Sequence, residues 1–396
     1  LSIDVLSSYP PVQEAEVDKV LAEEIRDNEK KIVVLDDDPT GVQTVHDISV
    51  YTNWEKASIE QGFAEENKLF YILTNSRGFT AAQTEKAHKE IAEVVDQVAK
   101  ETGKEYLFIS RSDSTLRGHY PLETTILKDE YEKNTGKKID GEVLCPFFKE
   151  GGRFTIDDVH YVQYDDTLVP AAETEFAKDK TFGYTVSNLK EYVEEKTQGA
   201  YKKENVTAIS LENIRELNYD KIEEQLLAVE DFNKVIVNAI DYVDVKIFCV
   251  ALFRAMKKGK NFMFRTAAAI VKVMGGVSNQ PLLTREQMVV KETDNGGIIV
   301  VGSHTDKTTR QMEKLRENKD IAFVELNATL VNDEAAFAEE VERCLALEEE
   351  YISSGKSVCV YTTRALITAD TGDKEDDLRL SVRISDAVQS LVGRLT

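Results

Sequence analysis

Three adjacent carboxylates, Asp36, Asp37 and Asp38, follow an apolar run and precede a Pro-Thr-Gly turn that ends at Gly41. The apolar run predicts a buried strand of an α/β protein, and such sheets bind ligands at the carboxyl ends of their strands. Carboxylates repel one another and lose solvation on burial, so stability does not explain three in a row. The segment indicates catalysis, cation binding or hydroxyl binding, with a helix N-cap or a solvated turn as the structural alternative.

Three further apolar runs end in polar segments of the same kind. These segments are residues 74–78, 111–119 and 145–148, the last a Cys-Pro-Phe-Phe run whose charged residue, Arg153, follows just behind in a Gly-Gly-Arg turn. One such loop would be ordinary. Four in succession predict the rim of a single binding site, because the carboxyl ends of parallel strands lie at one edge of a sheet.

These segments contain two kinds of side chain that suit an anionic, hydroxyl-bearing ligand. Guanidinium groups, which can bind a carboxylate or phosphate through paired hydrogen bonds, are present in Arg77, Arg117 and Arg153. Carboxylates, which accept hydrogen bonds from sugar-like hydroxyls and can take a proton from one, are present in Asp37, Asp38 and Asp113. Together they predict a site for a small polyhydroxylated acid. The alternative is that the two sets pair with each other as structural salt bridges.

The elements that must position these side chains alternate between strand and helix. Strands are predicted at 31–35, 69–73, 105–109, 141–144, 205–209, 234–237 and 261–264. Helices are predicted at 14–29, 80–101, 219–230 and 243–258. This alternation is typical of βαβ units and predicts a largely parallel sheet.

Residues 275–296, which are rich in glycine and polar residues, interrupt the alternation and predict a domain boundary. A second series then follows, with strands at 298–301, 321–325 and 357–361 and helices at 306–318, 333–352 and 378–395. The last helix carries an apolar stripe that must pack on a partner. We therefore expect an α/β fold of two domains, 1–285 and 286–396, each a largely parallel sheet flanked by helices.

Composition limits the classes of partner. The chain has 396 residues and a formal net charge of −23, which argues against nucleic acid or an anionic membrane as a partner. No apolar stretch is long enough for a membrane span, and the first residues lack a signal-peptide pattern. Four scattered cysteines and five scattered histidines predict neither a disulfide framework nor any metal-ligating residue. A reducing cytoplasm is the expected compartment.

One alternative enzyme class shares the first motif. The spacing Asp36-x-Asp38-x-Thr40 after a strand matches the nucleophile motif of haloacid dehalogenase-type phosphatases, and Thr74 resembles their second motif. In that chemistry Asp36 would accept the phosphoryl group and Asp38 would act as the acid and base. The match is short, and no convincing downstream lysine and acidic pair for magnesium accompany it.

Taken together, the polar segments resemble the four-carbon acid sugar kinase family. Residues 37–41 match its Asp-Asp-x-Thr-Gly loop, and residues 76–77 match its Ser-Arg loop end. The most specific match is the Asp-Ser-Thr-Leu-Arg-Gly run at 113–118. Residues 145–148 and 152–153 are similar to a later strand end and turn of that family but diverge in detail.

The resemblance implies an ATP-dependent kinase. Its first domain, 1–285, would bind threonate, erythronate or 3-oxo-tetronate, and its second, 286–396, would bind ATP with Mg²⁺ and so form the 4-phosphate. Asp37 or Asp38 would receive the hydroxyl proton. The residues expected to contact the sugar acid are Thr40, Ser76, Arg77, Asp113, Ser114, Arg117 and Arg153.

The second domain offers two residues for the nucleotide. By resemblance, Ser303, in a Gly-Ser turn before the helix predicted at 306–318, would contact ATP. Thr363, at the end of the strand predicted at 357–361, is expected in the same cleft. An ordinary helix N-cap is the alternative for the Gly-Ser turn.

One family feature is missing from this sequence. The Gly-Gly-x-Thr-Ser loop that cradles the nucleotide phosphates in the family would follow the helix predicted at 378–395, and it is not present. We expect either a shortened version of a longer protein or an incomplete ATP site. A non-catalytic sugar-acid-binding protein therefore remains a third functional class. A homodimer is also among the expected assemblies.

Overall fold

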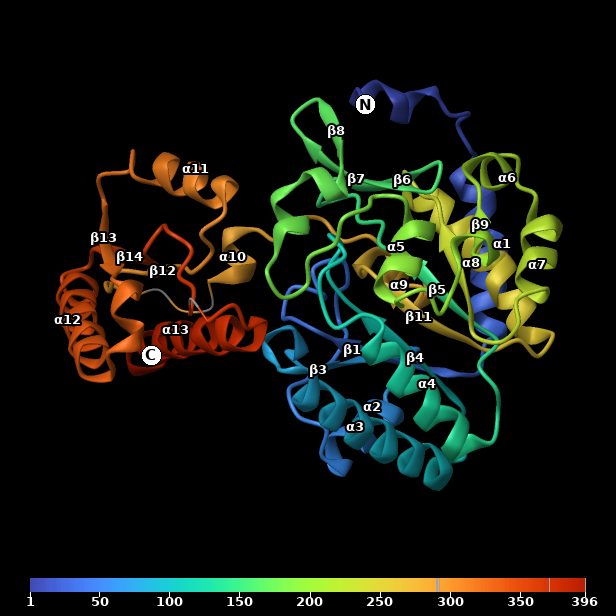
Figure 1. Cartoon of the computed structure of the whole chain (residues 1–396), viewed down its shortest axis with the longest axis horizontal. Coiled ribbons are helices and arrows are strands. Elements are labelled where there is room, and N and C mark those ends of the chain that lie inside the picture. Colours follow the sequence, from blue (N-terminus) through green and yellow to red (C-terminus); the bar gives the residue numbers. More distant parts are fainter. Residues whose placement is uncertain (290, 292, 370, 396) are drawn as a thin grey trace. The chain divides into compact units, whose positions relative to one another are not determined.

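The computed structural model describes residues 1–289, 291, 293–369 and 371–395, and its chain divides into two compact units, Leu1–Gln280 and Pro281–Thr396 (Figure 1). Each unit has a parallel sheet flanked by helices, which confirms the predicted α/β class. No described helix is long and apolar enough to cross a membrane.

The first unit is built on eight strands in the order β2-β3-β1-β4-β11-β5-β10-β9. The strands are β1 (Lys31–Asp36), β2 (Val50–Tyr51), β3 (Leu69–Leu73), β4 (Tyr106–Arg111), β5 (Gly141–Cys145), β9 (Thr207–Ile209), β10 (Asn233–Val237) and β11 (Phe262–Thr266). Every neighbouring pair is parallel. The carboxyl ends of the strands therefore lie along one edge of the sheet.

Helices cover both faces of this sheet, so β1 is buried along its whole length. Ile32 and Val34 pack towards α1 (Glu14–Asp27), α8 (Tyr242–Lys257) and α9 (Ala268–Met274). Val33 and Leu35 pack towards the opposite layer, which contains α2 (Lys56–Ala64), α3 (Ala81–Thr102) and α4 (Leu122–Thr135). This division follows from the alternation of side chains along a strand. The remaining helices of the unit are α5 (Leu189–Lys196), α6 (Leu211–Arg215) and α7 (Tyr219–Leu227).

A small antiparallel sheet, which the sequence did not predict, follows β5. It consists of β6 (Arg153–Ile156), β7 (Val159–Tyr164) and β8 (Thr167–Pro170). Asp157 and Asp158, the two residues between β6 and β7, both have positive φ, of 48° and 68°. Such a pair matches the twist of a two-residue hairpin. A backbone bridge between Thr155 and Ala239 connects the hairpin to the segment after β10.

The second unit has three parallel strands in the order β12-β14-β13. Its elements are β12 (Ile298–Val301), β13 (Ile321–Leu326), β14 (Ser357–Thr362), α10 (Arg285–Met288), α11 (Asp306–Leu315), α12 (Glu334–Ser353) and α13 (Lys374–Leu395). The apolar stripe of the last helix finds its partner here, because Leu380 and Leu391 are buried in one core with Phe337 and Val341 of α12. Short 3₁₀ helices complete the chain at Ile3–Ser8, Ser76–Gly78, Ala171–Glu173, Glu175–Lys178, Lys203–Asn205 and Ala328–Asn332.

Candidate functional site

Three neighbouring strands bring three of the four predicted segments together, and the fourth follows β5, which β11 separates from β4. β1 lies between β3 and β4, with Asp36 opposite both Leu73 and Arg111. The backbone N–H and the hydroxyl of Thr74 both donate to the Asp36 carbonyl at 2.9 Å. These bonds fix the loop after β3 beside the acidic turn. The strand order therefore creates the shared edge that the sequence predicted.

Asp36 is the innermost of the three acids and is fully buried. Arg111 Nε donates to its Oδ1 at 2.5 Å, while Oδ2 has no hydrogen-bond partner among the described residues. Burial raises the pKa of Asp36 to about 7, although Arg111 opposes the shift. A Cβ on Gly41 would lie 2.2 Å from Oδ2, so the turn requires glycine there. An inaccessible carboxyl cannot attack a phosphoester, and this geometry counts against the phosphatase alternative.

Asp37 and Asp38 differ in accessibility. Arg77 holds the buried Asp37 through two hydrogen bonds, from Nε at 3.1 Å and from Nη2 at 2.8 Å. Burial raises the pKa of Asp37, and the guanidinium groups of Arg77 and Arg111 oppose this shift. The Asp38 side chain is 20% exposed and lies 2.5 Å from Arg77 Nη1 and 2.9 Å from Arg111 Nη2.

Asp38 is thus the member of the trio that reaches solvent. Burial favours its neutral form, but the arginines and the Thr40 hydrogen bonds outweigh burial and hold the pKa of Asp38 below its ordinary value. The Thr40 backbone N–H donates to Asp38 Oδ1 at 2.8 Å. Asp38 is therefore an ionised carboxylate that a ligand can approach.

The third predicted loop, residues 113–118, is held rigidly. Arg117 Nε donates to Asp113 Oδ2 at 2.6 Å, and the pKa of Asp113 is held low, because Arg117 and Arg77 outweigh its burial. Burial lowers the pKa of His160 to about 4, and its Nε2 lies 2.7 Å from the Ser114 carbonyl, to which the neutral ring donates. The loop also contains Gly118 with φ of 117°, a conformation that favours glycine.

Arg117 and Arg153 share one aromatic platform. Their guanidinium carbons lie 5.1 Å and 5.5 Å from the ring centroid of Phe176. Arg153 Nε is buried and has no hydrogen-bond partner among the residues that the structure describes, and burial lowers the pKa of Arg153. A buried N–H without a partner is costly, and Arg153 as a whole is only partly buried, so its guanidinium group is suited to an anion that approaches the exposed part. The role of Phe176 was not predicted from the sequence.

A buried support lies behind these loops. The Ser76 hydroxyl donates to Glu123 Oε1 at 2.6 Å, and Arg265 Nη1 donates to Glu123 Oε2 at 3.0 Å. Arg265 Nη2 also donates to the Arg117 carbonyl at 2.9 Å. Ser76 is fully buried, so the structure places this expected substrate contact in the support instead. Neither Glu123 nor Arg265 was predicted, since β11, which carries Arg265, enters the sheet between β4 and β5 only in the fold.

The acidic trio was tested as a metal site. Carboxylate oxygens of Asp36, Asp37 and Asp38 lie within 4.8 Å of one another. Arg77 and Arg111 already contact all three carboxylates and offset two of the three negative charges that these carry when ionised. A divalent cation would be repelled by these two guanidinium groups. The trio therefore does not fit a resident Mg²⁺.

The two expected nucleotide contacts line a common cavity in the second unit. This cavity, of about 350 Å³, is bordered by Ser303, Thr363 and the α13 residues Ser381 and Ser385. Thr305 caps α11, and the hydroxyl of Ser303 lies 3.2 Å from that of Thr305. Backbone N–H groups at such a helix start can bind the phosphates of a nucleotide. The apolar and hydroxyl-bearing side chains of the cavity fit the uncharged part of such a ligand.

Comparison with known families gives two matches, one in each unit. Residues 32–274 match a sugar-binding N-terminal domain. Residues 298–396 match a nucleotide-binding C-terminal domain. No curated protein matches the sequence.

Solved structures of low sequence identity are similar to most of the chain. One from Salmonella typhimurium LT2, provisionally described as a tRNA synthase, is 14% identical with a TM-score of 0.53, covering 92% of this chain and 82% of that one. A Haemophilus influenzae protein is 17% identical with a TM-score of 0.46, covering 92% and 82%. A domain of unknown function from Bordetella bronchiseptica, a domain-swapped dimer with bound citrate, is 17% identical with a TM-score of 0.45, covering 91% and 80%. The Salmonella protein shows a shared fold.

Proposed function

Because the chain belongs to the four-carbon acid sugar kinase family, we propose that it is an ATP-dependent kinase for a four-carbon sugar acid. The substrate would be threonate, erythronate or 3-oxo-tetronate, and the product its 4-phosphate. One observation carries the proposal: an accessible, ionised Asp38 lies in the same network of charges as Arg117 and Arg153. Such a network suits a ligand that has a hydroxyl at one end and a carboxylate at the other.

The substrate carboxylate is assigned to Arg117 and Arg153. Both guanidinium groups are fixed by the Phe176 ring, and Arg153 Nε lacks a partner among the described residues. Arg117 donates to Asp113 through Nε, whereas all three nitrogens of Arg77 already contact Asp37 or Asp38. We therefore assign Arg77 to positioning these carboxylates. Charge-assisted hydrogen bonds from two planar groups favour a carboxylate over a neutral alcohol.

The proton acceptor is assigned to Asp38. It is ionised and 20% exposed, whereas Asp37 is buried and has a raised pKa. Asp38 would orient the terminal hydroxyl and receive its proton as phosphoryl transfer proceeds. Because phosphoryl transfer depends mostly on positioning and charge neutralisation, a carboxylate of low basicity is adequate. Thr40 and Ser114 would border the hydroxyl-bearing carbons.

ATP is assigned to the cavity that Ser303 and Thr363 line. The N–H groups at the start of α11 would hold phosphate oxygens. Mg²⁺, when bound with the nucleotide, would neutralise phosphate charge. The acidic trio of the first unit is not assigned to Mg²⁺, because Arg77 and Arg111 already form ion pairs with those carboxylates.

The decisive experiment measures ADP release with a panel of four-carbon acids and with erythritol, which lacks the carboxylate. We expect ADP release only when the correct acid is present, and none with erythritol. Phosphate release from a sugar-acid phosphate without ATP would support the phosphatase alternative. An increase in melting temperature with the acid but no turnover would identify a binding protein. Either result would overturn the kinase proposal.

A further inference from the structure

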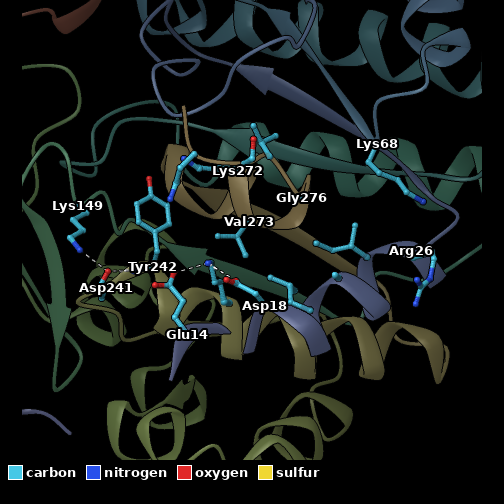
Figure 2. Close-up of a pocket in the computed structure, with 17 residues that line it drawn as sticks. Glu14, Asp18, Arg26, Lys68, Lys149, Asp241, Tyr242, Lys272, Val273 and Gly276 are labelled. Atoms are coloured by element: carbon cyan, nitrogen blue, oxygen red, sulfur yellow. Dashed lines mark hydrogen bonds and ion pairs between the residues drawn. The ribbon is translucent and has the colours of Figure 1, made fainter. Parts of the chain in front are cut away.

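A cavity of about 770 Å³ lies in the first unit, on the sheet face that α1, α8 and α9 cover (Figure 2). None of its lining residues belongs to the site at the carboxyl edge. Part of its lining is apolar, with Leu21 and Ile25 from α1 and Val273 and Val277 from α9 and the following turn. We call this cavity the α1–α9 groove. Its volume is typical of small-molecule sites.

The rim of the α1–α9 groove has more cations than anions. The basic lining residues are Arg26, Lys68, Lys149, Lys246 and Lys272, and the acidic ones are Glu14, Asp18 and Asp241. Each acid already has a partner. Lys246 Nζ lies 2.7 Å from Glu14 and 2.6 Å from Asp18, and Lys149 Nζ lies 2.8 Å from Asp241 (Figure 2).

Three cations of the rim remain without a carboxylate partner among the residues described: Arg26, Lys68 and Lys272. Arg26 and Lys68 lie together at one end of the groove, and Lys272 lies beside Tyr242 nearer the other end (Figure 2). The Lys272 Nζ is 5.5 Å from the Tyr242 ring centroid, and burial lowers the pKa of Lys272, with Glu150 opposing the shift. This local positive charge contrasts with the strongly negative chain.

We propose that the α1–α9 groove binds a small amphipathic anion, a molecule with an apolar or aromatic body and a single acid group. The apolar surface of Leu21 and Val273 would bury the body, which gains free energy in proportion to the area removed from water. The cations that lack a carboxylate partner among the described residues would attract the acid group, and the paired acids of the rim would not repel it strongly; the Lys68 amine, which donates to the Asn28 carbonyl at 2.7 Å, keeps its full positive charge. The tightest contact is expected at Lys272, where an anion would offset the cost of the half-buried amine.

The test uses 8-anilinonaphthalene-1-sulfonate as the probe, with binding followed by its fluorescence. We expect saturable binding at one site per chain. Lys272→Gln should weaken it at least about fivefold, the loss of one charge-assisted contact. Ala22→Trp should abolish it, because Ala22 is an exposed lining residue and the indole would fill the groove without disturbing the core.

Matched controls separate the groove from other apolar surfaces. Ala22→Ser and Lys203→Gln, a surface lysine paired with Glu191, should leave the affinity unchanged. Binding of the uncharged probe N-phenyl-1-naphthylamine should be lost in Ala22→Trp and unchanged in Lys272→Gln. Melting curves check that each variant is folded. Probe affinity that survives both Ala22→Trp and Lys272→Gln would place the dye elsewhere, for example in the cavity of the second unit, and would overturn the proposal.

Discussion

The two candidate sites use different chemical groups to bind a charged ligand. In the first unit, Asp36, Asp37 and Asp38 are held by the buried Arg111 and the partly exposed Arg77. In the second unit, hydroxyl groups line the cavity and a helix start offers backbone N–H groups. Fixed ion pairs can select a ligand that carries both a carboxylate and hydroxyls. Neutral donors hold phosphate oxygens while requiring less rigid surroundings.

The contrast extends to charges outside the sites. Asp36 and Asp37 are buried in contact with guanidinium groups. Glu348 on α12 is also fully buried, yet neither of its carboxylate oxygens has a hydrogen-bond partner among the described residues. Burial raises the pKa of Glu348 to about 7. The buried acids Asp36 and Asp37 of the first unit thus have cationic partners, whereas the buried Glu348 of the second unit has no hydrogen-bond partner among the described residues.

Asp38→Asn should have the largest effect on activity, because the first site is proposed to use the ionised Asp38 carboxylate as its proton acceptor. The amide keeps an oxygen acceptor for Thr40 but cannot take a proton, so kcat should fall about 10²–10⁴-fold. The melting temperature should stay close to that of the native protein. Steady-state ADP release measures the change, and the exposed Asp129→Asn is the control. Unchanged kcat would remove Asp38 from the mechanism.

Glu348→Gln tests whether the second unit contains an uncompensated charge. Between the ordinary pKa of a glutamate and about 7, the folded protein holds a proton that the unfolded chain releases, so the free energy of unfolding falls as pH rises through this interval. The variant lacks that decline. It should therefore exceed the native protein in stability at pH 8, by up to about 3 kcal/mol, with little difference near pH 5.

Calorimetric scans of both proteins at pH 5 and pH 8 measure this effect. Glu349→Gln, at the exposed neighbouring position, should show no such pH-dependent difference. An equal effect of Glu348→Gln at both pH values would show that the buried carboxyl does not titrate in this range.

Arg153→Met tests the anion-binding half of the first site. Losing a charge-assisted contact costs about 1.5–3 kcal/mol, so KM for the sugar acid should rise about 10–100-fold while KM for ATP stays constant. Arg153→Lys should restore part of the affinity, since it keeps the charge but not the planar fork. A parallel rise in both KM values would indicate a general disturbance of the protein.

Ser303→Ala should have the smallest effect, because backbone N–H groups at the start of α11 would also bind the phosphates in the second site. Removing one neutral hydroxyl should raise KM for ATP by about fivefold or less and leave KM for the acid unchanged. Initial rates at varied ATP concentration give the answer, with Ser354→Ala as a control outside the cavity. A hundredfold rise in KM for ATP would show that the second site, like the first, depends strongly on a single side chain.

Local patterns predicted most of the framework. The apolar runs at 31–35, 69–73 and 141–144 lie within β1, β3 and β5, and helix 80–101 corresponds to α3 within one residue at each end. Such patterns are visible because burial on both faces requires unbroken apolar strands. The β6–β8 sheet was missed, since its strands are only four to six residues long and β7 and β8 are mostly only partly buried.

The sequence by itself determined which chemical groups stand at the strand ends, because a parallel sheet places those ends along one edge whatever the strand order. Only the tertiary structure decided how the groups share that edge. It buried Asp36, exposed Asp38, placed Ser76 against Glu123 and brought Arg265 between β4 and β5. These outcomes depend on strand order and on side-chain burial. Both arise from contacts between residues far apart in the chain, which local patterns do not encode.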